Sequence, residues 1–329
     1  MTTSREQAQE AAKRAKAQQQ QQQAKPNGQA TFAPLIGMPL EDLIKVKLPE
    51  RPRLLGPWLT KSSLVMVHAR TGVGKTWFSL SAFQALAMGS TFLKWIADTP
   101  RKVLYIDGEM PGVMIQDRGR LLLNGQSTNG NLIVVTPDLQ SDPMPNLATE
   151  EGRARLEPLL SNVDALAIDH ITACIRPQGD GGEGDKWVQQ VQPWLLEKRR
   201  AGLAILLDHH SGKGGTQRGT SVREDILDVI IKLEQVGDEH DGARFKVVFE
   251  KTRGFYGKEA EAFEAQLHTQ KNGESFWSMS EADENEEFMT FVEMLRDKVP
   301  IEKVAKDLKV HRATAYRWKA KAIDKGLIL

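Results

Sequence analysis

The chain has 329 residues, 40% of them hydrophobic, and its 44 Lys and Arg residues nearly balance 43 Asp and Glu residues, for a formal net charge of +1. This length and composition are typical of a globular protein of about two domains and exclude a disordered or collagen-like chain. Because the overall charge is balanced, only its distribution along the chain can indicate a nucleic-acid or membrane partner.

Cysteine content and apolar runs indicate the compartment. The single cysteine, Cys174, excludes an internal disulfide framework and a cysteine-based zinc cluster, as expected for a reducing cytosol. No apolar run approaches the roughly 18 to 20 residues that cross a bilayer. The first residues carry basic side chains without an apolar core, so no secretory signal is predicted. We therefore expect a cytoplasmic protein with no membrane partner.

The N-terminal part divides into two segments. Residues 1–30 are rich in Ala, Gln, Lys and Arg and have no apolar stripe to bury, so a disordered Gln-rich tail is predicted. Residues 35–59 mix short apolar runs with four prolines. We expect this second segment to wrap onto the domain that follows it.

From residue 63 onward, short apolar runs alternate with amphipathic, helix-like stretches. The predicted strands are residues 63–67, 102–107, 131–135, 165–169, 203–208 and 244–250. Strands separated by helices require crossover connections, which give a mainly parallel sheet. The fold class expected for residues 31–280 is therefore α/β, a single ATPase domain built on such a sheet.

A phosphate-binding loop is predicted at "ARTGVGKT", which follows an apolar strand and precedes an amphipathic helix. In such loops, backbone N–H groups and the helix N-terminus hold phosphate oxygens. Lys75 is expected to reach the β and γ phosphates of ATP, and the Thr76 hydroxyl to bind Mg²⁺. The expected nucleotide-binding residues are Ala69, Arg70, Thr71, Gly72, Val73, Gly74, Lys75 and Thr76.

The usual pattern of this loop opens with glycine, where this chain has Ala69. A methyl group is tolerable there if the residue does not need a positive φ and does not touch phosphate. The departure therefore leaves nucleotide binding as the expected function.

Two carboxylates at the ends of predicted strands complete the expected site. Asp169 ends an apolar run at the edge of the sheet where ligands of parallel sheets collect, so we expect it to bind Mg²⁺ through water. Asp107 and Glu109 both follow another strand and could polarise the attacking water. Glu109 is the preferred base, because Gly108 allows a turn and the longer side chain reaches past the terminal phosphate.

The motifs "ARTGVGKT", "YIDGEMP", "ALAIDH", "ILLDHHSGKG", "RGTS" and "EKTRGFYG" together resemble the RecA-like ring ATPases of the RepA and DnaB helicase group, over about residues 55 to 260. The resemblance implies a RecA-like P-loop NTPase core with Glu109 as catalytic base. It further implies that His209 and His210 lie at the γ phosphate. Lys251 and Arg253 would then reach the nucleotide of a neighbouring subunit.

The resemblance also implies partners. A homohexamer would pass single-stranded DNA through its channel, with Lys213 and Arg218 on a loop that faces the strand, and would work with a replication initiator or a primase. One departure concerns an arginine of the RepA branch about ten residues past the "RGTS" position, where this chain has Asp228. Catalysis between subunits would therefore depend on Lys251 and Arg253; the alternative is a weaker or regulated ATPase.

A third segment, residues 281–329, begins with an acidic run that is expected to be a linker and ends in a basic region. Residues 298–329 contain nine Lys or Arg against three acidic residues. Residues 300–328 fit a helix-turn-helix pattern and resemble the DNA-binding domains of resolvases and repressors, although such modules also dock proteins. The residues expected to contact duplex DNA are Arg312, Thr314, Tyr316, Arg317, Lys319 and Lys321.

Three functions fit these features. The favoured one is an ATP-driven, ring-forming DNA helicase for replication of a plasmid, phage or mobile element. The alternative is a nucleotide-switched DNA-binding regulator or loader ATPase, which would bind duplex DNA without unwinding it. A signalling ATPase of the same fold would leave the basic C-terminal region unexplained.

Overall fold

The computed structural model describes residues 34–180, 182–211, 221–237, 243–270, 273–281, 286–308, 310, 312–324 and 327–328. The chain divides into one compact unit that ends at Glu50 and a second that runs from Arg51 to Leu329. The predicted tail, residues 1–30, and most of the predicted acidic linker lie outside the described residues. No helix in the described part of the chain is long and apolar enough to span a bilayer.

The boundary between the units divides the predicted wrapping segment. In the described part of the first unit, residues 34–50, the short helix α2 (Leu40–Leu43) is flanked by exposed apolar residues. The remainder of the segment belongs to the second unit, where β1 (Arg53–Leu55) pairs with β2 (Leu59–Thr60). Trp58 between these strands is fully buried.

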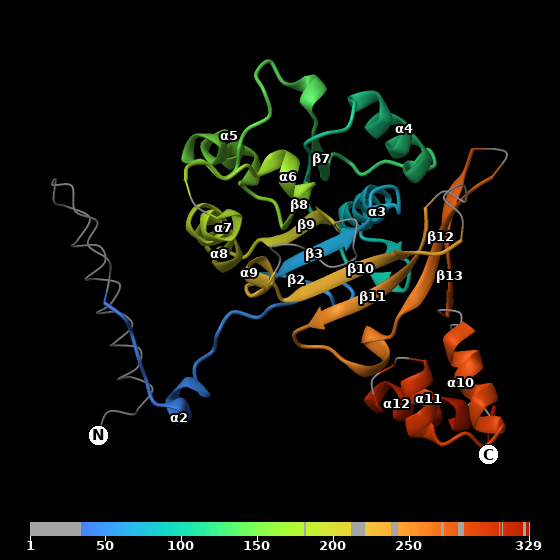
Figure 1. Ribbon diagram of the computed structural model, residues 1–329. Coiled ribbons are helices and arrows are strands. Elements are labelled where there is room, and N and C mark those ends of the chain that lie inside the picture. Colours follow the sequence, from blue (N-terminus) through green and yellow to red (C-terminus); the bar gives the residue numbers. More distant parts are fainter. Residues whose placement is uncertain are drawn as a thin grey trace. The chain divides into compact units, whose positions relative to one another are not determined.

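A nine-stranded sheet forms the centre of the second unit, in the order β13-β12-β11-β10-β3-β9-β8-β6-β7. The six strands from β10 to β7 are parallel, and β11, β12 and β13 continue the sheet antiparallel. The mainly parallel α/β sheet predicted from the sequence is thus confirmed (Figure 1). The strands are β3 (Leu64–Ala69), β6 (Val103–Asp107), β7 (Leu132–Val135), β8 (Ala165–Asp169), β9 (Ala204–His210), β10 (Val229–Gln235), β11 (Arg244–Thr252), β12 (Phe263–Thr269) and β13 (Ser275–Glu281).

All six predicted strands are present, but three strands of this sheet were not predicted: β10, β12 and β13. β10 pairs parallel with β3, beside the phosphate loop, and antiparallel with β11. The predicted strand over residues 244–250 is therefore the return strand of a hairpin and not a member of the parallel set. Two further short strands, β4 (Thr91–Phe92) and β5 (Trp95–Ile96), pair with each other.

Helices cover both faces of the sheet, and successive residues of its central strands are buried on opposite sides. Val65 and Val67 of β3 belong to one core with Phe78 of α3, whereas Leu64 and Met66 belong to a second core with Trp187 and Leu195. The helices are α3 (Lys75–Met88), α4 (Gly112–Leu123), α5 (Glu150–Leu160), α6 (Ile171–Cys174), α7 (Glu183–Gln190), α8 (Gln192–Arg200) and α9 (Ser221–Glu224).

Where the structure describes the C-terminal region, it contains three helices, α10 (Glu286–Arg296), α11 (Ile301–Asp307) and α12 (Arg312–Asp324), with a core of their own. The two helices expected from the sequence are α11 and α12, whereas α10 was not predicted. Trp318 of α12 packs edge-on against Phe291 of α10, with ring centroids 5.5 Å apart. The aromatic contacts thus pack α10 against α12.

Candidate active site

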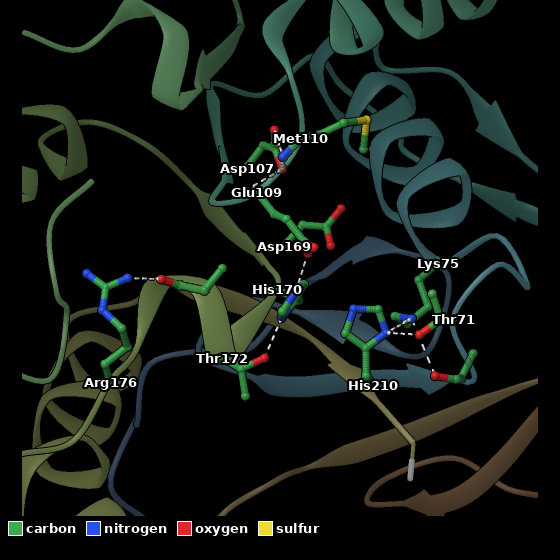
Figure 2. Close-up of polar contacts among 12 residues, drawn as sticks. Thr71, Lys75, Asp107, Glu109, Met110, Asp169, His170, Thr172, Arg176 and His210 are labelled. Atoms are coloured by element: carbon green, nitrogen blue, oxygen red, sulfur yellow. Dashed lines mark hydrogen bonds and ion pairs between the residues drawn. The ribbon is translucent and has the colours of Figure 1, made fainter. Parts of the chain in front are cut away.

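The candidate site lies at the carboxyl edge of the parallel strands, where β3, β6, β8 and β9 end. Because these strands are parallel neighbours, the residues that follow them meet at one edge of the sheet. Figure 2 shows Lys75, Glu109, Asp169, His170 and His210 converging there from separate parts of the chain. The structure therefore brings together the predicted phosphate-binding lysine, the predicted base and one predicted histidine.

The phosphate-binding loop has the backbone geometry that its glycines predict. Ala69 is the buried last residue of β3, so it adopts a strand conformation and needs no positive φ. Gly72 has φ 90° and Gly74 has φ 118°, values that residues with a Cβ rarely adopt. A Cβ at Gly74 would lie 3.1 Å from Cε1 of Phe245, so packing also favours glycine there. The absent first glycine is thus no obstacle to the loop.

Lys75 begins α3, and its side chain is buried under the loop. Its Nζ lies 3.3 Å from the carbonyl oxygen of Ala69 and 2.8 Å from Nδ1 of His210. Burial lowers the pKa of Lys75, while nearby carboxylates act in the opposite direction. A desolvated ammonium beside a glycine-containing loop at a helix N-terminus fits a phosphate group of a nucleotide.

His210 ends β9, and it is uncharged at neutral pH. Burial, followed by the charge of Lys75, lowers the pKa of His210 to about 4. An ammonium can only donate, so Nδ1 of His210 accepts a hydrogen bond from Lys75 and the ring proton lies on Nε2. Thr71 Oγ1 lies 3.4 Å from the same Nδ1. His210 can therefore offer an N–H donor through Nε2 while it contacts the phosphate-binding lysine.

His209 points the other way from its neighbour, because side chains alternate along β9. It is buried, and its Nδ1 has no hydrogen-bond partner among the described residues. Burial is the main cause that lowers the pKa of His209 to about 4. The structure thus places His210 beside Lys75 and His209 in the protein interior.

Asp169 and Asp107 end the neighbouring strands β8 and β6, and both are buried. Asp169 Oδ2 accepts a hydrogen bond of 2.6 Å from the hydroxyl of Tyr105, a partner that the sequence did not indicate. Asp107 accepts backbone hydrogen bonds from Glu109 and Met110, at 3.3 and 3.2 Å. Burial raises the pKa of Asp107 to about 6. Asp107 therefore shapes the turn that carries Glu109.

Glu109 contacts a residue that the sequence did not single out. Its Oε2 lies 2.5 Å from Nε2 of His170, and Thr172 Oγ1 lies 2.6 Å from the other ring nitrogen. Nothing in the sequence pattern distinguishes His170 from any polar residue after a strand. Only the adjacency of β6 and β8 in the sheet brings it to Glu109.

Two sets of side chains at this edge could hold a metal ion. Glu109, His170 and His210 place ligand atoms within 4.8 Å of one another. Glu109 and His170 are already hydrogen-bonded to each other, and Mg²⁺ prefers oxygen ligands. The buried Asp169 carboxylate and Thr76, in the first turn of α3, offer oxygens and fit Mg²⁺ better.

Lys251 and Arg253 lie at the end of β11 and contact their own chain. Lys251 Nζ donates to the carbonyl oxygen of Glu224 at 2.5 Å, and an Arg253 guanidinium nitrogen donates to that of Asp225 at 3.1 Å. The Arg253 backbone N–H donates to the carbonyl oxygen of Asp228 at 2.9 Å. Within one subunit, the two side chains therefore hold residues 224 and 225, and the Arg253 backbone holds residue 228.

Asp228, where the family pattern differs, has a structural role. Its buried carboxylate accepts a hydrogen bond of 2.9 Å from the backbone N–H of Leu64, at the start of β3. The same Oδ2 lies 3.4 Å from Arg51 and 3.7 Å from Arg199. An arginine at position 228 would place a third cation beside Arg51 and Arg199. This explains why the chain differs from the family pattern at this position.

The residues expected to contact DNA fall into three groups. Lys213 and Arg218 lie outside the described residues. Arg312 lies 3.6 Å from Glu302, whose carboxylate also accepts a hydrogen bond of 2.8 Å from the Tyr316 hydroxyl. The other α12 residues expected to contact DNA are Thr314, which is half-buried, and Arg317, Lys319 and Lys321, which are exposed.

Residues 33–216 match the family described as AAA domain, and this match spans more than half of the chain. The chain therefore belongs to the AAA domain family. DNA repair protein RadA of Streptococcus pneumoniae (strain ATCC BAA-255 / R6) is 26% identical over 198 residues, which are 60% of this chain and 41% of RadA. The chain thus matches less than half of RadA's length.

Among solved structures, this chain is similar to a KaiC-like protein of Pyrococcus horikoshii OT3. The identity is 14%, the TM-score is 0.46, and the match covers 70% of this chain and 99% of that protein.

Proposed function

We propose that the chain is a DNA-dependent ATPase that assembles into a homohexameric ring and translocates on single-stranded DNA as a helicase, in the replication of a plasmid, phage or mobile element. The observation that carries the ATPase part is the convergence of Lys75, Glu109 and His210 at one sheet edge. These side chains come from three separate segments, and each supplies a different function that phosphoryl transfer needs.

The proposed reaction uses each side chain for one task. The loop backbone and the Lys75 ammonium bind the β and γ phosphates of ATP. Glu109 accepts the proton of the attacking water, and Nε2–H of His210 donates to a γ-phosphate oxygen as charge develops. Thr76 and Asp169 would hold Mg²⁺, which when bound would supply further positive charge near the phosphates.

Coupling to movement depends in this proposal on the subunit interface. Lys251 and Arg253 lie together at the end of a strand, and rearrangement of residues 224–228 would free them to reach a neighbour's nucleotide. Mixing Arg253→Ala with Glu109→Gln tests this. Some interfaces in the mixture then combine Glu109 of one subunit with Arg253 of its neighbour. ATP hydrolysis by the mixture should therefore exceed the summed hydrolysis of the two variants measured separately. If the mixture shows no gain, catalysis between subunits is excluded.

The C-terminal helices support a second candidate, a nucleotide-switched DNA-binding regulator or loader. Three helices with their own core present exposed basic side chains on α12. A helix of this kind fits the major groove of duplex DNA. RadA carries the name of a DNA repair protein, which supports a DNA-related role for its relative without selecting between the candidates.

One experiment separates the two candidates. ATP hydrolysis is measured with single-stranded or duplex DNA, on protein whose mass in solution is determined in parallel. A helicase predicts stimulation by single strands in a ring-sized species, together with unwinding of a forked duplex. A regulator predicts hydrolysis that is indifferent to single strands and duplex binding that changes between ATP and ADP.

A further inference from the structure

We propose that His170 is a positioning residue for ATP hydrolysis: it holds the Glu109 carboxylate in place through its Nε2–H group, and Thr172 fixes the orientation of its ring. The inference rests on the proposed function of Glu109 as the base that activates water. It adds two residues, His170 and Thr172, that neither the phosphate loop nor the carboxylate pattern indicates.

The contacts form a chain of three side chains. Nε2 of His170 lies 2.5 Å from Oε2 of Glu109, and Nδ1 lies 2.6 Å from Oγ1 of Thr172 (Figure 2). Both nitrogens of the imidazole are therefore engaged, and the ring cannot flip without losing both contacts. An imidazole fixed at both ends is a rigid support for a carboxylate.

The proton positions follow from the chemistry of the partners. An ionised carboxylate only accepts hydrogen bonds, so the short contact with Glu109 requires the proton on Nε2 of His170. Nδ1 makes its hydrogen bond with the hydroxyl of Thr172, which can donate or accept. This arrangement commits Oε2 of Glu109 to His170 and leaves Oε1 to accept a proton from water.

Exposure shows which residue supports the other. The Glu109 side chain is 67% exposed, whereas that of His170 is 13% exposed. A long, exposed side chain samples several rotamers, and ordering it costs conformational entropy. His170 offsets this cost before water and nucleotide meet Glu109, which is the usual advantage of preorganised groups.

The backbone keeps the pair together. The N–H of Gly108 donates to the carbonyl oxygen of Asp169 at 2.8 Å, so the residues just before Glu109 and His170 are bonded to each other. A Cβ at Gly108 would lie 2.5 Å from Sγ of Cys174 and 2.9 Å from Cβ of Ala173, both on the helix that carries Thr172. The turn that bears Glu109 therefore packs directly against α6.

The test compares His170→Ala, His170→Gln and Thr172→Val in the full chain, by steady-state ATP hydrolysis and by binding of a fluorescent ADP analogue. His170→Ala should lower kcat by about 10- to 100-fold, the range seen when a supporting partner is removed. The KM for ATP and the affinity for the analogue should change less than about twofold. Gln keeps an N–H donor, so it should restore part of kcat, and Thr172→Val should cause a smaller loss than His170→Ala.

A double-mutant cycle with Glu109→Gln shows whether His170 acts through Glu109. If it does, adding His170→Ala to Glu109→Gln lowers kcat no further. A matched control is His268→Ala, which removes a hydrogen bond of 2.7 Å to Ser278 on the antiparallel part of the sheet and should leave kcat unchanged. If His170→Ala also weakens analogue binding and lowers the thermal midpoint while Gln restores nothing, the role is structural and the inference is wrong.

Different results would contradict the role of His170 and the role of Glu109. If Glu109→Gln and Lys75→Ala are inactive while His170→Ala hydrolyses ATP like the wild type, His170 does not position the base and the ATPase site stands. If Glu109→Gln retains wild-type hydrolysis, the assignment of the base fails and the role of His170 fails with it.

Discussion

The ammonium of Lys75 donates to Nδ1 of His210 over 2.8 Å, although the two residues are 135 positions apart in the chain. The pairing in register of β3 with β9, which sets Ala69 opposite His210, produces this contact. It links the phosphate-binding loop to the end of β9 and leaves Nε2–H of His210 available to a substrate. In the proposed reaction, their proximity would join phosphate binding and charge stabilisation in one place.

We expect His210→Ala to separate binding from hydrolysis. Lys75 would keep its contact with the carbonyl oxygen of Ala69, so nucleotide binding should stay within about threefold of wild type. Loss of an N–H donor to the developing charge should lower kcat by about 100-fold, as for other such donors. Steady-state hydrolysis and analogue binding measure the two effects. Loss of binding with unchanged kcat would contradict this assignment.

Tyr105→Phe should affect Mg²⁺ dependence and stability together. The variant removes a buried hydrogen bond to a carboxylate, which typically contributes about 1.5 to 3 kcal/mol to the free energy of unfolding. Asp169 would also lose the partner that orients it, so we expect the Mg²⁺ concentration for half-maximal hydrolysis to rise by about 10-fold. The matched control is Tyr256→Phe, because Tyr256 is 87% exposed. An unchanged Mg²⁺ requirement would argue against Asp169 as a ligand.

The buried His209 predicts a loss of stability in acid. Burial, and then the charge of Arg223, lowers the folded-state pKa of His209 to about 4, below its ordinary value of 6.5. Between these values the unfolded chain binds one more proton, so stability falls as the pH falls from about 6.5 towards 4. From pH 7 to pH 5 this contribution falls by about 2 kcal/mol.

Urea unfolding of the wild type and His209→Leu at pH 7, 6 and 5 isolates that contribution. Asp107, whose pKa is raised to about 6, acts in the opposite direction, but it is present in both proteins and cancels in the difference. The wild type should lose more stability than the variant as the pH falls. Parallel losses would show that His209 is not held uncharged by the fold.

Local sequence patterns predicted six strands of the sheet and the phosphate-binding loop, but not the contacts of His170 and Tyr105. An apolar run before "TGVGKT" specifies a strand, a loop and a helix, so Lys75 and Gly74 could be assigned from the sequence. The sequence pattern indicates a channel loop over residues 211–221, and β10 is not predicted because no long helical pattern separates this loop from it. The contacts of Glu109 with His170 and of Tyr105 with Asp169 depend on strand order, which no local pattern encodes.

The C-terminal helices give a prediction about DNA. Reversing two exposed charges with Arg317→Glu and Lys319→Glu should abolish duplex binding while hydrolysis without DNA stays unchanged. The control reverses the exposed Lys303 and Lys306 of α11. If α12 contacts phosphates, replacing Arg317 and Lys319 with Ala should reduce the slope of log affinity against log salt by about 2. Equal losses in the control would indicate a general charge effect and no specific role for α12.

The most direct test of the account is Mg²⁺-dependent ATP hydrolysis by the wild type and by Glu109→Gln, each with and without single-stranded DNA. If the proposed function holds, the wild type hydrolyses ATP and is stimulated by single strands, whereas Glu109→Gln binds nucleotide with wild-type affinity and turns over at least about 100-fold more slowly. Wild-type turnover by Glu109→Gln would contradict the catalytic assignment. Hydrolysis unaffected by single strands would contradict translocation.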